Sequence, residues 1–149
     1  MPAFGKRSLA ALGSADERLQ RLFHEVVKTY DCTVLCGHRG QEEQEEAFRA
    51  GFSKEHWPNS KHNSFPSKSV DVAPYPVVWP TPGMSREDYA LAMGRFYYFA
   101  GYVRRAAEQM GLRVRQGVDW NGNFDIRDQS FHDLPHTELV EGGTEGGAA

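Results

Sequence analysis

The segment over residues 85–111 constrains the fold most, because its pattern predicts one long helix. Ser85 and, three residues later, Asp88 form a capping-box pattern that marks a helix start. Apolar residues then recur at the spacing of one helix face, and Gly111 marks the end. The apolar residues are Tyr89, Met93, Phe96, Ala100, Val103, Ala107 and Met110. The sequence therefore predicts a helix that runs through all of them.

Shorter patterns complete the secondary structure. Ser14 precedes an acidic first turn and an apolar helical spacing, which together predict a helix over residues 15–30. A short polar helix is expected over residues 41–50, where Gly51 stops it. Residues 75–83 are rich in proline and are expected to form an extended loop. Strands are expected over residues 33–36, 69–73, 112–115 and 136–140.

Helices combined with a few strands that do not alternate strictly indicate an α+β domain. The expected sheet is small, mostly antiparallel and packed with helices. A length of 149 residues fits one domain, which we expect over residues 1–140. Residues 141–149 are rich in glycine and have nothing to bury, so a disordered tail is expected there.

Charge and hydropathy exclude several classes of protein. The net charge of -3 gives no basic footprint, so binding to nucleic acid is not expected. No apolar run is long enough for a membrane anchor, and the first residues lack the apolar core of a signal peptide. We therefore expect the chain to be made and folded in a cytoplasm.

The two cysteines, Cys32 and Cys36, lie at either end of a predicted strand. Regular alternation would place both on the same face of that strand. Two free, buried thiols are the expected state in a reducing compartment. A disulfide and a metal site are the alternatives, although no second cysteine pair completes a metal site.

Two histidines and an aspartate form a candidate metal site. His62 lies in a polar loop, Asp71 lies within a predicted strand, and His136 begins the last one. Catalytic zinc usually takes three protein ligands and keeps a fourth position open. Asp133, three residues before His136, is a carboxylate that is available to take a proton from water. The chain therefore has the pattern of a small zinc hydrolase.

Three of these four residues also have a structural interpretation. His62 alone is compatible with an ordinary loop histidine, and Asp71 with the solvated face of a strand. Asp133-Leu134-Pro135 is a good turn sequence. Only the combination points to zinc, because such a site draws imidazole and carboxylate ligands from separate loops.

Motifs along nearly the whole chain resemble one family of cell-wall metallopeptidases. The family includes D-Ala-D-Ala carboxypeptidases, D-Ala-D-Ala dipeptidases and phage L-alanyl-D-glutamate endopeptidases, and Hedgehog N-terminal domains share its fold. Its pattern of Ser-x-His, Asp, and Glu or Asp-x-x-His matches Ser60-Lys61-His62, Asp71 and Asp133 to His136. Gly37-His38-Arg39 with Gln44 resembles the family's Gly-x-Arg and Gln segment, and Asp119-Trp120-Asn121-Gly122 resembles the Asp-Trp stretch of the phage members.

The chain departs from the family pattern in the first motif. Nine steps separate His62 from Asp71, where seven are common, and Ser69 replaces a small Ala. The longer loop, which contains Pro66, is expected to absorb the extra residues before the strand.

The resemblance implies a role for each matching residue. His62, Asp71 and His136 would hold Zn²⁺. Asp133 would be the general base on water and then the acid for the leaving amine. Arg39 would hold the developing negative charge of the scissile carbonyl, although a surface ion pair with a neighbouring glutamate is the alternative. Ser60 and His132 have weaker claims as hydrogen-bond partners of the ligands.

The implied function is a peptidoglycan endopeptidase of the phage endolysin type that cuts the L-alanyl-D-glutamate bond of the stem peptide. A D-Ala-D-Ala carboxypeptidase or dipeptidase is the alternative enzyme. A zinc-stabilised module that binds cell wall without cutting it is a second class. A His-Asn nuclease, suggested by His62-Asn63 alone, is a third.

Such an endolysin would be a monomer that works without a membrane anchor of its own. We expect it to accumulate in the host bacterial cytoplasm and to reach the wall only after release. Because no signal is evident, a holin-type pore made by another protein would be needed for export.

Overall fold

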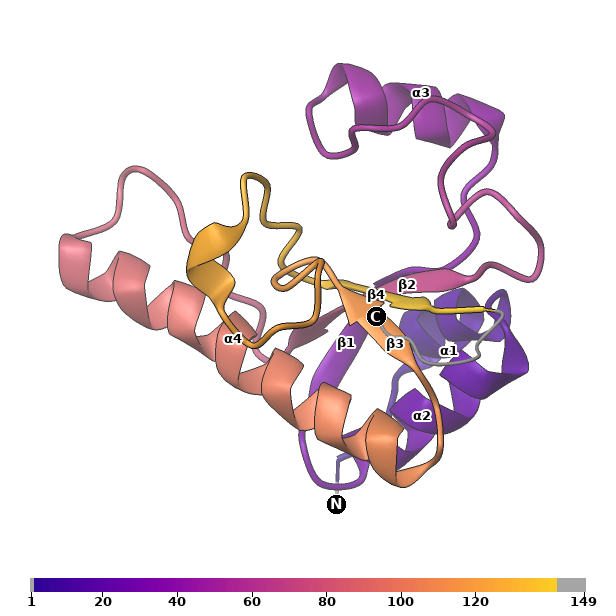
Figure 1. Ribbon diagram of the computed structural model, residues 1–149, viewed down its shortest axis with the longest axis horizontal. Coiled ribbons are helices and arrows are strands. Elements are labelled where there is room, and N and C mark those ends of the chain that lie inside the picture. Colours follow the sequence, from indigo (N-terminus) through magenta and orange to yellow (C-terminus); the bar gives the residue numbers. More distant parts are fainter. Residues whose placement is uncertain (1, 142–149) are drawn as a thin grey trace.

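The computed structural model describes residues 2–141, and within them four α-helices surround a four-stranded antiparallel sheet (Figure 1). The strand order is β1-β2-β4-β3. The strands are β1 (Cys32–Cys36), β2 (Ser69–Pro74), β3 (Val114–Gln116) and β4 (His136–Leu139). The helices are α1 (Lys6–Gly13), α2 (Glu17–Val27), α3 (Gln41–Arg49) and α4 (Arg86–Gln109), with a short 3-10 helix, η1 (Ile126–Asp128). The predicted α+β class is confirmed.

The long helix α4 begins and ends as its sequence pattern predicts. The Ser85 side chain accepts a hydrogen bond from the Asp88 backbone N–H at 3.0 Å, and Gly111 has a positive φ of 74° just beyond the helix end. Helices α2 and α3 also lie within their predicted ranges, and all four predicted strands are present within a few residues.

Helix α1 was not predicted, because its buried face includes a polar residue. Ser8 is 7% exposed and accepts a hydrogen bond from the Val34 backbone N–H of β1 at 3.0 Å, whereas Leu9 is 46% exposed. The helix therefore lacks the apolar stripe by which a sequence reveals an amphipathic helix.

The main hydrophobic core lies between the sheet and helices α1, α2 and α4. Val70 and Val72 of β2 face this core, whereas Asp71 between them faces the opposite side of the sheet. Helix α3 and the segment after it lie on the far side of the sheet from α2 (Figure 1). The core residues are Leu12, Ala15, Leu19, Leu22, Phe23, Val26, Val27, Cys32, Val34, Val70, Val72, Phe99, Val103, Ala107 and Leu139.

The expectation that Cys32 and Cys36 share a face of β1 is wrong, because the strand is irregular. Its pairing with β2 shifts between Val34 and Cys36, so that Cys36 lies opposite Asp71. A bulge of this kind reverses the alternation of side chains beyond it. Cys32 is buried in the core, whereas Cys36 is half-buried on the other face. Both thiols are free.

The C-terminal end of the described chain is attached to the body of the protein. Glu141 makes ion pairs with Arg18 at 2.9 Å and with Lys68 at 3.3 Å. The rest of the predicted tail, residues 142–149, lies outside the described residues, and the assignment of 1–140 to a single domain stays a prediction. Among the helices of the described part, none has a stretch long and apolar enough to cross a membrane.

Candidate active site

Three elements bring His62, Asp71 and His136 together on the face of the sheet away from the core. His62 comes from the loop after α3, Asp71 lies in β2, and His136 begins β4 directly opposite Asp71 in the strand register. His62 Nε2 lies 3.3 Å and His136 Nδ1 lies 3.4 Å from the same oxygen, Asp71 Oδ1. Two ring nitrogens and one carboxylate oxygen therefore converge on one point, as the sequence predicts.

These three atoms are buried and lack hydrogen-bond partners. His62 Nε2, Asp71 Oδ1 and His136 Nδ1 all belong to the small set of buried side-chain atoms without a partner in the described residues. Leaving such atoms unsatisfied costs free energy, so a group that each of them contacts is expected at their meeting point. Two imidazoles and a carboxylate are a typical ligand set for a catalytic zinc ion. The residues present fit this metal.

Each imidazole ring is held by a hydrogen bond at the nitrogen that does not approach Asp71, which leaves the other nitrogen directed at the candidate metal site. His62 Nδ1 donates to the Gly37 carbonyl at 2.8 Å, and His136 Nε2 donates to Glu138 Oε1 at 2.8 Å. When the ring is neutral and its proton is on that nitrogen, each ring presents a lone pair at the other nitrogen. Carbonyl and carboxylate partners of this kind fix the tautomer of a metal-binding histidine.

Glu138 is a site residue that sequence reasoning missed. It lies two residues after His136 on β4, so both side chains point to the same face. Its side chain is 5% exposed, and the Arg115 guanidinium on the neighbouring strand donates to Glu138 Oε2 from Nε at 3.0 Å and from Nη2 at 2.7 Å. The alternation of β4 was the available signal, because it puts a carboxylate beside the histidine.

Asp71 dominates the electrostatics of the site. Burial disfavours the charged form of each histidine. Interactions with Asp71, assisted by Cys36 at His62 and by Glu138 at His136, outweigh it and raise the pKa of His62 to about 10 and that of His136 to about 9. Burial likewise opposes the Asp71 charge, yet the two imidazoles hold the pKa of that carboxyl far below its usual range. The site therefore favours a cation, and protons compete with a metal ion for the same nitrogens.

Asp133 lies beside the converging atoms and is a separate carboxylate. Its Oδ2 is 3.7 Å from His136 Nδ1, and its side chain is 25% exposed. Burial, together with the negative charge of Asp71, raises the pKa of Asp133 to about 6. A carboxylate with a pKa near neutrality, next to a metal site, suits a general base.

Gly117 sets the position of Asp133. The Asp133 backbone N–H donates to the Gly117 carbonyl at 2.9 Å, and a Cβ at Gly117 would lie 2.1 Å from the Asp133 carbonyl oxygen. Only glycine permits this close approach of the two backbones.

Arg39 points into the site and not to the surface. Its side chain is 14% exposed, with Nη2 3.5 Å from Asp71 Oδ2 and Nη1 donating to Gln44 Oε1 at 3.0 Å. Gln44 is itself fully buried. The alternative of a surface ion pair with a neighbouring glutamate is therefore wrong.

Cys36 forms a second, overlapping group of possible metal ligands with His62 and Asp71, besides the group of Asp71, Asp133 and His136. Its sulfur lies 3.8 Å from His62 Nδ1, the nitrogen that already donates to Gly37. Cys36 thus contacts the Nδ1 edge of the ring, whereas Nε2 is the nitrogen that approaches Asp71, so Cys36 lies outside the proposed ligand set.

The longer loop between His62 and Asp71 does not displace these two residues from the site. The Lys68 backbone N–H donates to the Lys61 carbonyl at 3.0 Å and closes the loop, while Phe65 is 72% exposed. The extra residues are therefore directed into solvent.

Ser60 accepts a hydrogen bond from the His62 backbone N–H at 3.1 Å, so it holds the backbone and not the ring. His132 contacts Tyr97 at 3.4 Å and does not line the cleft.

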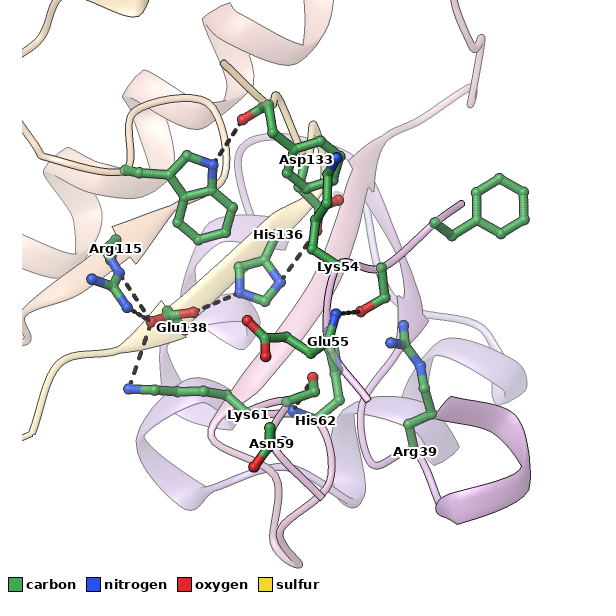
Figure 2. Close-up of a pocket in the computed structure, with 15 residues that line it drawn as sticks. Arg39, Lys54, Glu55, Asn59, Lys61, His62, Arg115, Asp133, His136 and Glu138 are labelled. Carbon is green, nitrogen blue, oxygen red and sulfur yellow. Dashed lines mark hydrogen bonds and ion pairs between the residues drawn. The ribbon is translucent and has the colours of Figure 1, made fainter. Parts of the chain in front are cut away.

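A cleft of about 410 Å³ opens over the site (Figure 2). Trp120 forms one wall, with its ring 5.4 Å from that of His136 and its Nε1 donating to the Phe131 carbonyl at 2.8 Å. Lys54, from the segment after α3, lies over the Phe131 ring at 4.9 Å. The candidate metal site is thus open to a ligand of peptide size on one side and buried on the other.

An α+β fold with a cleft over two imidazoles and two carboxylates is compatible with a small hydrolase. A family model described as phage L-alanyl-D-glutamate peptidase matches residues 2–140, and the chain belongs to this family. The L-alanyl-D-glutamate peptidase of Escherichia phage T5 is 26% identical over 147 residues, covering 92% of this chain and 97% of that protein. The resemblance inferred from the motifs is confirmed.

The fold also matches a solved structure. The crystal structure of the Serratia marcescens L-Ala D-Glu endopeptidase ChiX is similar with a TM-score of 0.63 and 25% identity, covering 93% of this chain and 91% of that chain.

Proposed function

We propose that this protein is a zinc-dependent endopeptidase that hydrolyses the L-alanyl-D-glutamate bond of the peptidoglycan stem peptide. Membership of the peptidase family supports a peptidase that acts on cell-wall peptides. One observation carries the zinc proposal. Three buried atoms without hydrogen-bond partners, one each from His62, Asp71 and His136, converge on one point. Zinc suits them because it accepts nitrogen and oxygen ligands together in tetrahedral sites.

The chemistry divides between the metal and the chain. When bound, zinc would polarise the scissile carbonyl and lower the pKa of a water molecule to about 7. Asp133 takes the proton of the attacking water and then donates it to the leaving amine. Arg39 stabilises the negative charge that develops on the carbonyl oxygen. Gly37 and Glu138 hold the two imidazoles in place throughout.

The alternatives have less support from the structure. A binding module without catalysis would not need Asp133 to be held beside the ligands with a raised pKa. A His-Asn nuclease would need Asn63 near a substrate, but its amide donates to the Arg39 carbonyl at 3.0 Å and to Gln44 at 3.1 Å. A D-Ala-D-Ala peptidase uses the same chemistry, and the family match favours the L-alanyl-D-glutamate bond over it.

Defined peptides and mass analysis test the proposal. We expect a synthetic stem peptide to be cut between L-alanine and D-glutamate, with chelation abolishing the reaction and added zinc restoring it. Cleavage at a D-Ala-D-Ala bond alone would establish the alternative enzyme. Activity that persists in metal-free protein would contradict the zinc mechanism.

We further propose that the protein acts as a monomer, accumulates in the bacterial cytoplasm and reaches the wall through a holin-type pore. Expression inside bacteria should leave cells intact until a separate pore is opened, when lysis should follow. The variant Asp133→Asn, expressed at the same level, serves as the matched control and should not lyse cells after the pore opens.

A further inference from the structure

The cleft has a positively charged edge, formed by Lys61 and Arg115, that the proposed chemistry does not use. Both side chains line the cleft and approach the buried carboxylate of Glu138, at 3.5 Å for Lys61 Nζ and 2.7 Å for Arg115 Nη2. Figure 2 shows this Lys61–Arg115 edge on the side of His136 and His62 away from Arg39.

The charges at this edge do not balance. Glu138 carries one negative charge and is 5% exposed, whereas the side chains of Lys61 and Arg115 are 38% and 47% exposed. One carboxylate thus faces two cations, which leaves a net positive charge directed at the cleft. The whole chain, by contrast, has a net charge of -3.

Arg115 also keeps one guanidinium nitrogen available as a hydrogen-bond donor. Its Nε and Nη2 both donate to Glu138 Oε2, while Nη1 has no acceptor among residues 2–141. The guanidinium lies 5.9 Å over the Trp120 ring, which limits its movement. A planar guanidinium held in this way is well suited to a carboxylate ligand.

The other cations of the cleft are engaged elsewhere. Arg39 pairs with Asp71 and Gln44, and Lys54 lies over the Phe131 ring. The exposed Glu55 also lines the cleft, but it makes no ion pair with Lys61 or Arg115. The Lys61–Arg115 edge is therefore the best-placed site for an anionic group of a bound peptide.

The substrate class supplies such a group. A glutamate residue has two carboxyl groups, so one stays free whichever of them makes the next bond of the chain. The alanine before the scissile bond has only a methyl side chain. We propose, on the basis of the proposed function, that Lys61 and Arg115 bind the free carboxylate of the glutamate residue and thereby determine specificity.

A pair of matched peptides tests this subsite. Both contain an L-alanyl-glutamate bond of the same stereochemistry and are blocked at their ends, and they differ only in a free carboxylate or a carboxamide on the glutamate. We expect kcat/KM of the parent protein to be about 10-fold or more higher for the acid, since a charge-assisted hydrogen bond is lost with the amide. In Lys61→Met and in Arg115→Gln the acid-to-amide ratio should fall towards one.

The acid-to-amide ratio of kcat/KM within each variant separates loss of carboxylate recognition from loss of active protein. A misfolded fraction or lost zinc lowers the rates for both peptides equally and leaves the ratio unchanged. Lys54→Met removes a positive charge from another residue that lines the cleft, one that lies over the Phe131 ring, and should keep the parent ratio. Equal hydrolysis of both peptides by the parent, or an unchanged ratio in both Lys61→Met and Arg115→Gln, would overturn the subsite alone. Hydrolysis of neither peptide would overturn the proposed function itself.

Discussion

At the scale of single residues, the two carboxylates of the site differ in what surrounds them. Asp71 lies between two imidazoles and Arg39, which keep it ionised. Asp133 is buried near the Asp71 charge and has a pKa raised to about 6. The first therefore suits a metal ligand and the second a base that exchanges protons near neutral pH.

Substitution by asparagine should separate these roles. Asp133→Asn keeps the shape but cannot take a proton, so turnover should fall by roughly 10² to 10⁴-fold with zinc still bound. Asp71→Asn removes an anionic ligand and should lower zinc content instead. Zinc analysis and peptide-cleavage rates on both variants decide the matter. If Asp133→Asn loses zinc while Asp71→Asn retains it, ligand and base have been exchanged.

Arg39→Ala should lower turnover by about 10²-fold with zinc retained, as expected for the loss of a donor to the developing oxyanion. Arg39→Lys should restore only part of it, because an ammonium lacks the planar fork. Arg49→Ala on α3 is the matched control, since Arg49 is 64% exposed and pairs with Glu46. Near-normal turnover in Arg39→Ala would remove this residue from the mechanism.

The raised pKa of Asp133 has a consequence for stability in the presence of a chelator. The folded state holds the Asp133 proton more tightly than the unfolded state, whose pKa is near 3.8. This contribution is fully present below pH 3.8 and is lost as pH rises through about 6. At pH 7 the ionised carboxylate should therefore destabilise the metal-free fold.

Chemical unfolding across pH checks this expectation. Asp133→Asn in chelator should be more stable than the parent by about 1–3 kcal/mol at pH 7, from a shift of roughly two pKa units. The difference should vanish below about pH 4, where both side chains are neutral. Equal stability of the two proteins at pH 7 would show that Asp133 is not desolvated in the folded state.

At the scale of elements, the site depends on strand register and on two close backbone contacts. The β2–β4 register places Asp71 opposite His136, and a slip of one residue would turn both away from the site. A Cβ at Gly37 would lie 2.1 Å from the Ala11 carbonyl oxygen at the end of α1. Helix α1 therefore supports the segment whose carbonyl holds His62.

Gly117→Ala should displace Asp133 and lower turnover by about 10-fold or more, since small misplacements of catalytic groups are costly. The overpacking should also destabilise the protein by about 1–3 kcal/mol. Gly94→Ala in α4 is the control, because nothing lies within 4 Å of its added Cβ. That change should leave turnover intact. Full turnover in Gly117→Ala would show that this contact does not position the base.

Helix and strand positions could be predicted where the pattern is local. Helix α4 shows its cap, its apolar stripe and its terminal glycine in the sequence, whereas α1 buries Ser8 and shows no such stripe. The bulge in β1 was not predictable either, because it arises from pairing with β2. That bulge, and not the spacing of the cysteines, places Cys36 beside His62.

At the scale of the whole molecule, the apolar core and the site occupy opposite faces of the sheet. Asp71 reaches the site from a strand whose neighbouring valines, Val70 and Val72, are 0% and 1% exposed in the core. The three converging side chains come from segments far apart in the chain. A metal that joins them should therefore stabilise the folded state as a whole.

Zinc should raise the stability by about 2.7 kcal/mol when its free concentration is 100 times Kd. The corresponding rise in Tm is about 5–10 °C. His136→Ala should lose this response, whereas His132→Ala, which removes an imidazole outside the cleft, should retain it. Thermal unfolding with and without zinc measures both. A parent protein whose Tm does not respond to zinc would contradict the proposed site.

The sequence by itself predicted the helices with clear local patterns and the α+β class. With the family resemblance, it also predicted the candidate site residues His62, Asp71, Asp133, His136 and Arg39. Periodicity and side-chain chemistry are local properties, and they can be read without knowing the fold. Only the tertiary structure decided which atoms meet: the oxygen of Asp71 that both imidazoles approach, the Gly37 carbonyl behind His62, and Glu138 behind His136. These contacts join residues from separate strands and loops, so they depend on register and packing, which no local pattern records.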